Sequence, residues 1–198
     1  MAVKKGNEIP TIDVALVTLT IPNSADEIAL DTSSKIQVSV QSETEDAVKL
    51  IIKGRLIAQK REKVTITGNT IVLTDNVFNP EMVTILQGGT VKYWTNESHS
   101  EEGDEDTGNG VSSYTPPVAG STDETPAFTL NAYSAIYNAA GLITGYEKIK
   151  YPNCKGTPIE LNSEDNVFRA PEYTINSAPD IGEPPYEISY VTSLPVVS

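Results

Sequence analysis

The single histidine, His99, is the only side chain that could serve a Ser-His-Asp or Cys-His arrangement. It stands in a stretch rich in acidic residues, glycine and proline (residues 96–125), where we expect no packed core. A catalytic base must be held within hydrogen-bonding reach of the group that it serves. The sequence therefore predicts that His99 is a solvated loop side chain, and it predicts no catalytic residue.

Two acidic groups have spacings that could support chemistry. Asp104–Gly110 places oxygen-bearing residues at alternate positions, as calcium loops do, but lacks the later bidentate glutamate of an EF-hand. Glu164 and Asp165 could act as an acid–base pair on a sugar, although adjacent carboxylates in a turn are more often caps or surface. We expect solvated acidic surface in both places, with no metal and no cofactor.

Cys154 is the only cysteine, which excludes an intrachain disulfide and a zinc site built from several thiolates. The neighbouring Lys155 could lower the pKa of the thiol, but with no partner histidine in view we expect a structural role. Gly88-Gly89 follows a predicted helix, whereas the glycines of a phosphate-binding loop precede one. No phosphate-binding loop is predicted.

One short helix is predicted after Asn79, which can cap the free amides of the first turn. Pro80 suits the first helical position, Glu81 places negative charge at the positive end of the dipole, and Gly88 can end the helix. Phe78 and Val83 have the spacing of a hydrophobic staple. So short a helix must be held by packing on a sheet. The predicted packing face consists of Phe78, Met82, Val83 and Leu86, with Ile85 beside them.

Most of the remaining chain alternates apolar and polar residues with a period of two, which is typical of strands with one buried face. A change of phase within residues 11–21 predicts a bulge, and Gly68-Asn69 predicts a two-residue hairpin turn between 64–67 and 70–73. Residues 60–63 are expected to form a basic tip or solvated edge. The other predicted strands are 36–40, the long run 47–58, 90–94, 127–137, 142–151 ended by Pro152, a segment around Phe168, Tyr173 and Ile175, and 186–191.

These elements predict a mainly β fold: an antiparallel β-sandwich or barrel with one short flanking α-helix. We expect an N-terminal arm at residues 1–10 and a single β domain at 11–198, from which the acidic Gly/Pro-rich loop at 96–125 projects.

The chain has 198 residues and a formal net charge of −13, which argues against binding to nucleic acids or anionic membranes. No apolar run is long enough to span a bilayer, and residues 1–7 lack the apolar stretch of a secretion signal. The sequence therefore predicts a protein made and kept in a cytoplasm, with no membrane partner.

Several segments resemble the tail tube proteins of phages and prophages of Gram-positive bacteria. The residues before and in the predicted helix look like that family's hairpin-then-helix segment, and together the similar runs cover about half of the chain, mostly after residue 65. The similar runs are Gly68–Gly89, Phe128–Tyr133, Gly145–Ile149, Tyr151–Gly156, Tyr173–Ile175, Tyr186–Ile188 and Leu194-Pro195.

The resemblance implies a structural subunit of the virion, assembled in the host cytoplasm. Subunits of that family join edge to edge into hexameric rings that close an inner β-barrel, and the rings stack into a tube, beside other tail proteins such as a sheath or terminator. DNA passes through a negatively charged lumen without specific binding. The family's long hairpin maps here to residues 42–63, which implies an assembly interface at Lys49, Lys53, Arg55, Lys60 and Arg61.

Two other classes of function stay open on the sequence. One is a monomeric β-sandwich that decorates a virion or binds a surface. The other is a hydrolase that uses two carboxylates on a β scaffold. Size in solution distinguishes the first from a tube subunit, because only the tube subunit forms rings or polymers.

Overall fold

The computed structural model describes residues 8–22, 27–94, 110–122 and 124–197, which form twelve strands and one helix. The helix is α1 (Pro80–Gln87). The strands are β1 (Thr11–Thr20), β2 (Glu27–Leu30), β3 (Ser33–Glu45), β4 (Val48–Ile52), β5 (Arg55–Lys60), β6 (Lys63–Asp75), β7 (Thr90–Tyr93), β8 (Val111–Thr115), β9 (Phe128–Tyr137), β10 (Ile143–Gly156), β11 (Glu172–Ser177) and β12 (Glu187–Val191).

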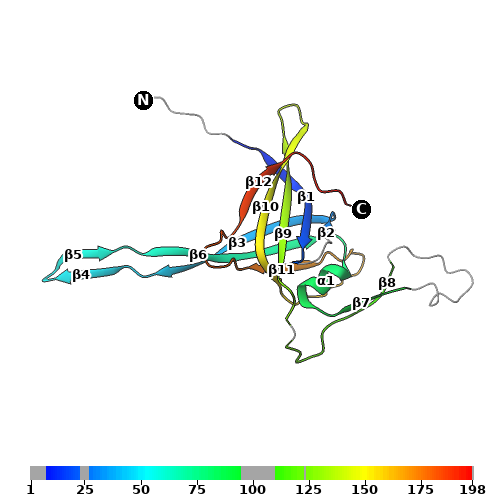
Figure 1. Ribbon diagram of the computed structural model, residues 1–198, viewed down its shortest axis with the longest axis horizontal. Coiled ribbons are helices and arrows are strands. Elements are labelled where there is room, and N and C mark those ends of the chain that lie inside the picture. Colours follow the sequence, from blue (N-terminus) through cyan, green and yellow to red (C-terminus); the bar gives the residue numbers. More distant parts are fainter. Residues whose placement is uncertain (1–7, 23–26, 95–109, 123, 198) are drawn as a thin grey trace, which may run out of the picture.

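One antiparallel sheet dominates the fold, with the strand order β2-β1-β9-β10-β11-β6-β3 and with β12 paired to β10. Figure 1 shows β1, β9, β10 and β12 running along one direction, while β3, β6 and β11 run across them. Strand β3, at the end of this strand order, lies close to β1 near the other end, so the sheet wraps around its own core. The prediction of a mainly β, antiparallel fold with one short helix is confirmed.

The sheet divides along β10, the longest strand. One side of β10 pairs with β9 along most of its length, whereas its other side pairs first with β12 and then with β11. The core lies between the two parts of the sheet and under α1. Its fully buried members include Val17, Leu19, Ile71, Leu73, Leu130, Tyr173 and Ile175.

The sequence around α1 produces the predicted caps. The Asn79 side chain accepts a hydrogen bond from the Met82 amide at 3.0 Å, and the Gly88 amide donates to the Thr84 carbonyl at 2.9 Å. Met82, Val83 and Leu86 are buried, and Phe78 is half-buried against the core. The helix is therefore held by its apolar face, as a two-turn helix must be.

The predicted hairpin turn at Gly68-Asn69 is wrong, because β6 continues through both residues. Gly68 is needed for a close approach: a Cβ atom there would lie 2.2 Å from the carbonyl oxygen of Ser177. Opposite Gly68, the pairing of β3 shifts register between Gln41 and Ser42, which is the signature of a bulge. A glycine inside a strand thus marks a bulge and a crowded contact here, not a turn.

Replacing Gly68 by alanine is expected to lower the free energy of unfolding by about 1–3 kcal/mol, because the added methyl group meets backbone that cannot move aside cheaply. Chemical denaturation measures the change. Thr67→Ala, at an exposed position of the same strand, is the matched control and should change stability by less than about 0.5 kcal/mol. Equal stabilities for the two variants would contradict the close contact.

The run 47–58 was predicted to be one strand. It forms two strands, β4 and β5, which pair antiparallel. The turn between them lies at Lys53 and Gly54, whose φ angles are 48° and 76°. Two successive residues with positive φ match the type I′ turn that suits the twist of a hairpin. Residues 60–63 are exposed at the junction of β5 and β6, as the predicted solvated edge requires, and the tip of the hairpin lies instead at Lys53 and Gly54.

Three other boundaries differ from the sequence prediction. Pro152 does not end β10, which runs on to Gly156 through a register shift between Tyr151 and Cys154, a place where a strand tolerates proline. Phe168 lies outside β11 in an exposed loop. Within the predicted loop 96–125, Val111–Thr115 forms β8 and pairs with β7, and the Tyr114 hydroxyl donates to the Gly88 carbonyl at 2.7 Å. Residues 96–109 lie outside the described part.

Candidate assembly surface

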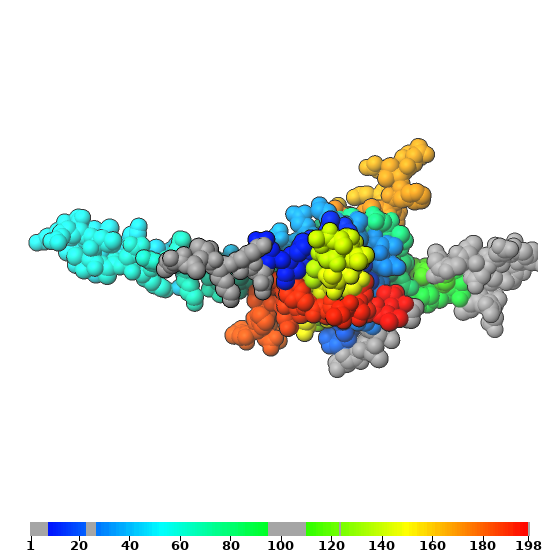
Figure 2. Space-filling view, turned by 90° about the horizontal axis from the view of Figure 1, so that it is seen from above, coloured from blue at the N-terminus to red at the C-terminus, as the bar shows by residue number. Residues whose placement is uncertain are grey.

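A long hairpin arm leaves the sheet where β3 and β6 extend beyond the core. We define it as residues 37–67, and every residue in this range is exposed. The arm pairs the distal parts of β3 and β6 and then β4 with β5. Figures 1 and 2 show it projecting from the body along the longest axis of the molecule. From Ser42 to Ile66 the strands of the arm pair only with one another in the described part of the chain.

The arm carries aliphatic side chains that a solvent-facing hairpin does not need. Leu50, Ile51 and Leu56 are 51%, 59% and 55% exposed, and basic residues precede or follow them in β4 and β5. A two-stranded ribbon without a hydrophobic face to pack on is marginally stable in water. Contiguous exposed apolar surface on a strand pair is typical of an interaction site. The remaining exposed apolar residues are Val38, Val40, Val48, Ile52, Ile57, Val64 and Ile66.

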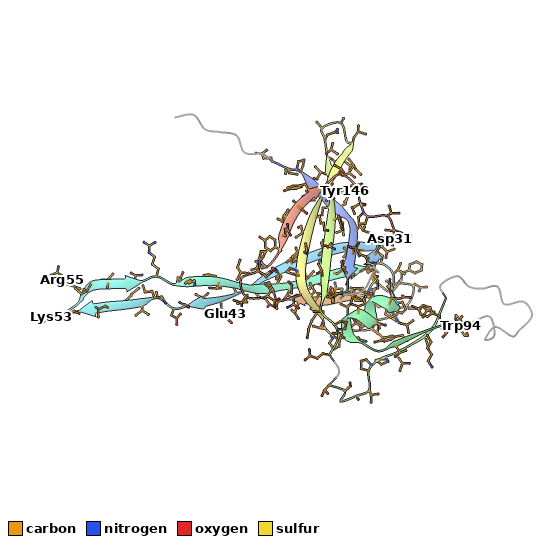
Figure 3. The ribbon with its side chains drawn as sticks, viewed as in Figure 1. Asp31, Glu43, Lys53, Arg55, Trp94 and Tyr146 are labelled. Atoms are coloured by element: carbon orange, nitrogen blue, oxygen red, sulfur yellow. The ribbon has the colours of Figure 1, made fainter. Side chains whose placement is uncertain are left out.

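The same arm concentrates positive charge. Residues 48–63 contain six basic and one acidic side chain, a net +5, which leaves −18 for the remainder of a chain whose total is −13. Figure 3 shows Lys53 and Arg55 at the tip of the arm. Lys60 pairs with Glu45 across the arm at 2.8 Å, in a solvated position. All five residues of the predicted interface, Lys49, Lys53, Arg55, Lys60 and Arg61, therefore lie on one exposed element.

Three strands of the main sheet, β2, β3 and β12, have one side with which no strand pairs in the described part of the chain. Strand β3 continues into the hairpin arm, which leaves β2 and β12 as the two edges outside the arm. Four antiparallel steps separate β2 from β12 in the order β2-β1-β9-β10-β12, so the two edges run in the same direction. Copies related by rotation could therefore join β2 of one to β12 of the next in parallel, which removes both edges.

The face of this sheet that points away from the core is mixed in charge. Ile149 and Ala132 pair with each other on the core side, so their neighbours Lys148 and Lys150 face outward. The Lys148 ammonium lies 5.6 Å above the Tyr133 ring. By the same registers Glu27 and Glu187 share this outer face, so carboxylates and ammonium groups lie side by side on it.

Edge strand β2 is fixed by a polar network. The Thr18 hydroxyl donates to Glu27 at 2.5 Å, and the Asn131 amide donates to both, at 3.2 and 3.3 Å. Thr18 and Asn131 are buried, whereas Glu27 is exposed at the start of β2. The bonds tie the start of β2 to β1 and β9 and so fix the position of this edge strand.

The residues tested for chemistry are not brought together. His99 and nearly all of Asp104–Gly110 lie outside the described residues. In the described ranges no group of three or more His, Cys, Asp or Glu side chains could hold a metal. Cys154 is fully buried, and burial raises the pKa of its thiol to about 11. Its Sγ donates to the Tyr151 carbonyl at 3.3 Å.

The buried thiol predicts resistance to alkylation. Its raised pKa keeps it protonated in the folded protein through the pH range in which the thiol of an unfolded chain, whose pKa is ordinarily about 9.0, forms thiolate. We expect iodoacetamide to label denatured chain at pH 8–9 at least tenfold faster than folded chain. Peptide mass analysis of Cys154 measures this. Equal labelling rates would place the thiol at the surface.

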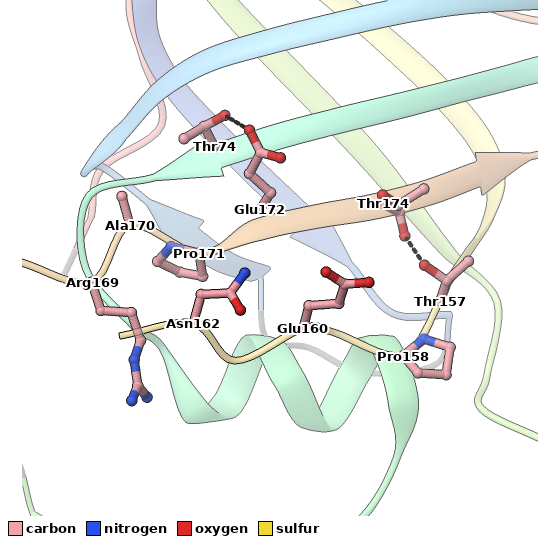
Figure 4. Close-up of a pocket in the computed structure, with 10 residues that line it drawn as sticks. All are labelled: Thr74, Thr157, Pro158, Glu160, Asn162, Arg169, Ala170, Pro171, Glu172 and Thr174. Atoms are coloured by element: carbon pink, nitrogen blue, oxygen red, sulfur yellow. Dashed lines mark hydrogen bonds between the residues drawn. The ribbon is translucent and has the colours of Figure 1, made fainter. Parts of the chain in front are cut away.

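A polar cavity of about 640 Å³ lies between the loop at residues 157–171 and strands β6 and β11. Figure 4 shows Glu160 and Glu172 among its lining residues. Thr74 donates to Glu172 at 3.5 Å, and both carboxylates are exposed. Glu164 and Asp165, the pair considered from the sequence, lie in the exposed turn outside this lining. Sequence reasoning did not point to Glu160 or Glu172, which are separated by eleven intervening residues.

No helix in the described ranges is both long and apolar enough to cross a membrane.

No protein-family model matches the chain, and no curated protein matches it. Among solved structures, it is similar to a chain of the cryo-EM structure of the anti-feeding prophage baseplate, 6-fold symmetrised. The TM-score is 0.37 at 8% sequence identity, and the match covers 95% of this chain and 97% of that chain. A likeness at this level assigns no function to the chain.

Proposed function

We propose that the chain is a non-enzymatic structural subunit of a phage tail tube that assembles with copies of itself into stacked rings within the virion. The observation that supports this most is the hairpin arm, which exposes aliphatic and basic side chains on an otherwise acidic molecule. Such an arm gains stability when a second copy covers it, because each half-exposed aliphatic side chain adds about 1 kcal/mol on full burial.

The open edges support ring formation. Joining β2 to β12 of a neighbour is a heterologous contact, and repetition of such a contact closes a ring when the rotation allows it. Six subunits per ring, other tail proteins as partners and passage of DNA follow from the family resemblance. The negatively charged lumen stays a prediction from the resemblance. The outward face of β9 and β10 carries Lys148 and Lys150, so a lumen lined by this face would have mixed charge. A lumen wall of mixed charge also avoids strong binding of phosphate.

The experiment is sedimentation velocity over a concentration series, with negative-stain electron microscopy of the largest species. The expected result is rings or tubes with a central channel. A chain that remains a monomer at every concentration contradicts the proposal and favours a β-sandwich decoration or binding module.

A further inference from the structure

A groove beside the start of α1 has the chemistry to receive the hairpin tip. This helix-end groove, of about 410 Å³, is lined by Asp31, Val77, Phe78, Glu81 and Val111, among others. Its carboxylates come from two distant parts of the chain, and the described residues that line it include no Lys or Arg. Val77 is 54% exposed and Phe78 is half-buried, so the floor is apolar and accessible.

The hairpin tip has the complementary character. Leu56 and Ile51 face each other in the pairing of β4 and β5, and both are more than half exposed. Lys53 lies in the turn next to them, and Arg55 follows the turn directly. Aliphatic side chains suit the apolar floor, and the two cations suit the two carboxylates. Beside the groove, the guanidinium carbon of Arg169 lies 5.6 Å from the centroid of the Phe78 ring.

The arm cannot fill the groove of its own chain. Strands β3 and β6 run without interruption from the body into the arm, which fixes its direction. Figure 3 shows Lys53 and Arg55 at one end of the molecule and Asp31 on the opposite side of the body. A tip-to-groove contact therefore joins two copies through different surfaces, and such a contact propagates from copy to copy.

We propose that the tip of the hairpin arm docks into the helix-end groove of a second copy of this chain, with Leu56 over Val77 and with Lys53 and Arg55 near Asp31 and Glu81. This inference rests on the proposed self-assembly and names the receiving surface. A nucleic acid is a poorer occupant for the tip, because residues 37–67 contain no aromatic side chain on which bases could stack.

Cysteine cross-linking tests the contact directly. An equimolar mixture of full-length L56C and V77C, mildly oxidised at a concentration at which the protein assembles, is expected to give a disulfide-linked dimer on a non-reducing gel. The native Cys154 is buried and does not interfere. A mixture of L56C with L142C is the control, since Leu142 is 64% exposed but lies in the loop between β9 and β10. It should give no dimer above that of L56C alone.

Charge exchange gives a second readout. K53E/R55E and D31K/E81K are each expected to raise the concentration needed for assembly about tenfold, and the four substitutions combined should restore it. If the chain assembles but L56C and V77C do not cross-link, or if the combined variant does not recover assembly, the docking site is wrong and the proposed function is unaffected. Absence of assembly in the unsubstituted chain overturns both. If L56C and V77C do not cross-link, and K53E/R55E loses the ability of the unsubstituted chain to bind a mixed-sequence DNA, the tip binds nucleic acid and not a second copy.

Discussion

Replacing Leu86 by aspartate is expected to abolish cooperative folding. Leu86 is 1% exposed, and a Cβ atom built at Gly156 of β10 would lie 2.5 Å from its Cα atom, so helix and strand are in direct contact there. Removing a buried leucine costs about 2–5 kcal/mol, and burying an unpaired carboxylate costs several more. Together these approach the whole stability of a typical domain, about 5–15 kcal/mol.

Circular dichroism during heating measures the effect. L86D should show no cooperative transition, or one shifted downward by tens of degrees. Leu86→Met conserves volume and polarity, so it should cost less than about 1.5 kcal/mol and melt close to the unsubstituted chain. Similar melting of L86D and L86M would refute the packing of α1 on β10.

The helix was predictable because its signals are local. Asn79, Pro80 and Gly88 act within a few residues of their own positions, and the apolar face follows from the period of 3.6. The strands were predictable where alternation reports burial on one face, as in β1 with its bulge between Ile12 and Leu16. The mainly β class followed from these two kinds of evidence.

The errors in the sequence prediction arose where a residue responds to a distant partner. Gly68 is a glycine because Ser177, on another strand, approaches its backbone. Strand β8 pairs with β7, and its Tyr114 bonds to the Gly88 carbonyl at the end of the helix. Strand β4 and strand β5 looked like one run because both are apolar, and only the backbone turn at Lys53 separates them. None of these partners can be read from local composition.

The candidate assembly surface could also be predicted only in part from the sequence. The basic residues of the arm could be picked out from the sequence because they are close together within residues 48–63. The helix-end groove could not, because Asp31, Glu81 and Val111 come from three segments that only the fold brings together. Charge complementarity between arm and body was visible in the composition, but the place where it acts was not.

Reversing Lys49, Lys53 and Arg55 to glutamate is expected to abolish self-assembly while leaving the subunit folded. The change takes the net charge of residues 48–63 from +5 to −1 and that of the chain from −13 to −19. Opposed like charges then replace attraction at each contact between copies. All three side chains are exposed on the arm, so each substitution should alter unfolding by no more than about 0.5 kcal/mol.

Sedimentation velocity and thermal melting of the same samples separate the two effects. Lys35→Glu with Lys92→Glu is the control, because both residues are exposed but lie outside the arm, and this variant should still assemble. Added salt should weaken assembly of the unsubstituted chain and have little effect on the reversed one, since screening acts on the attraction that the reversal has removed. Polymers of the triple variant indistinguishable from those of the unsubstituted chain would show that the arm does not join subunits, and the exposed aliphatic residues along β4 and β5 would then need a partner other than a second copy.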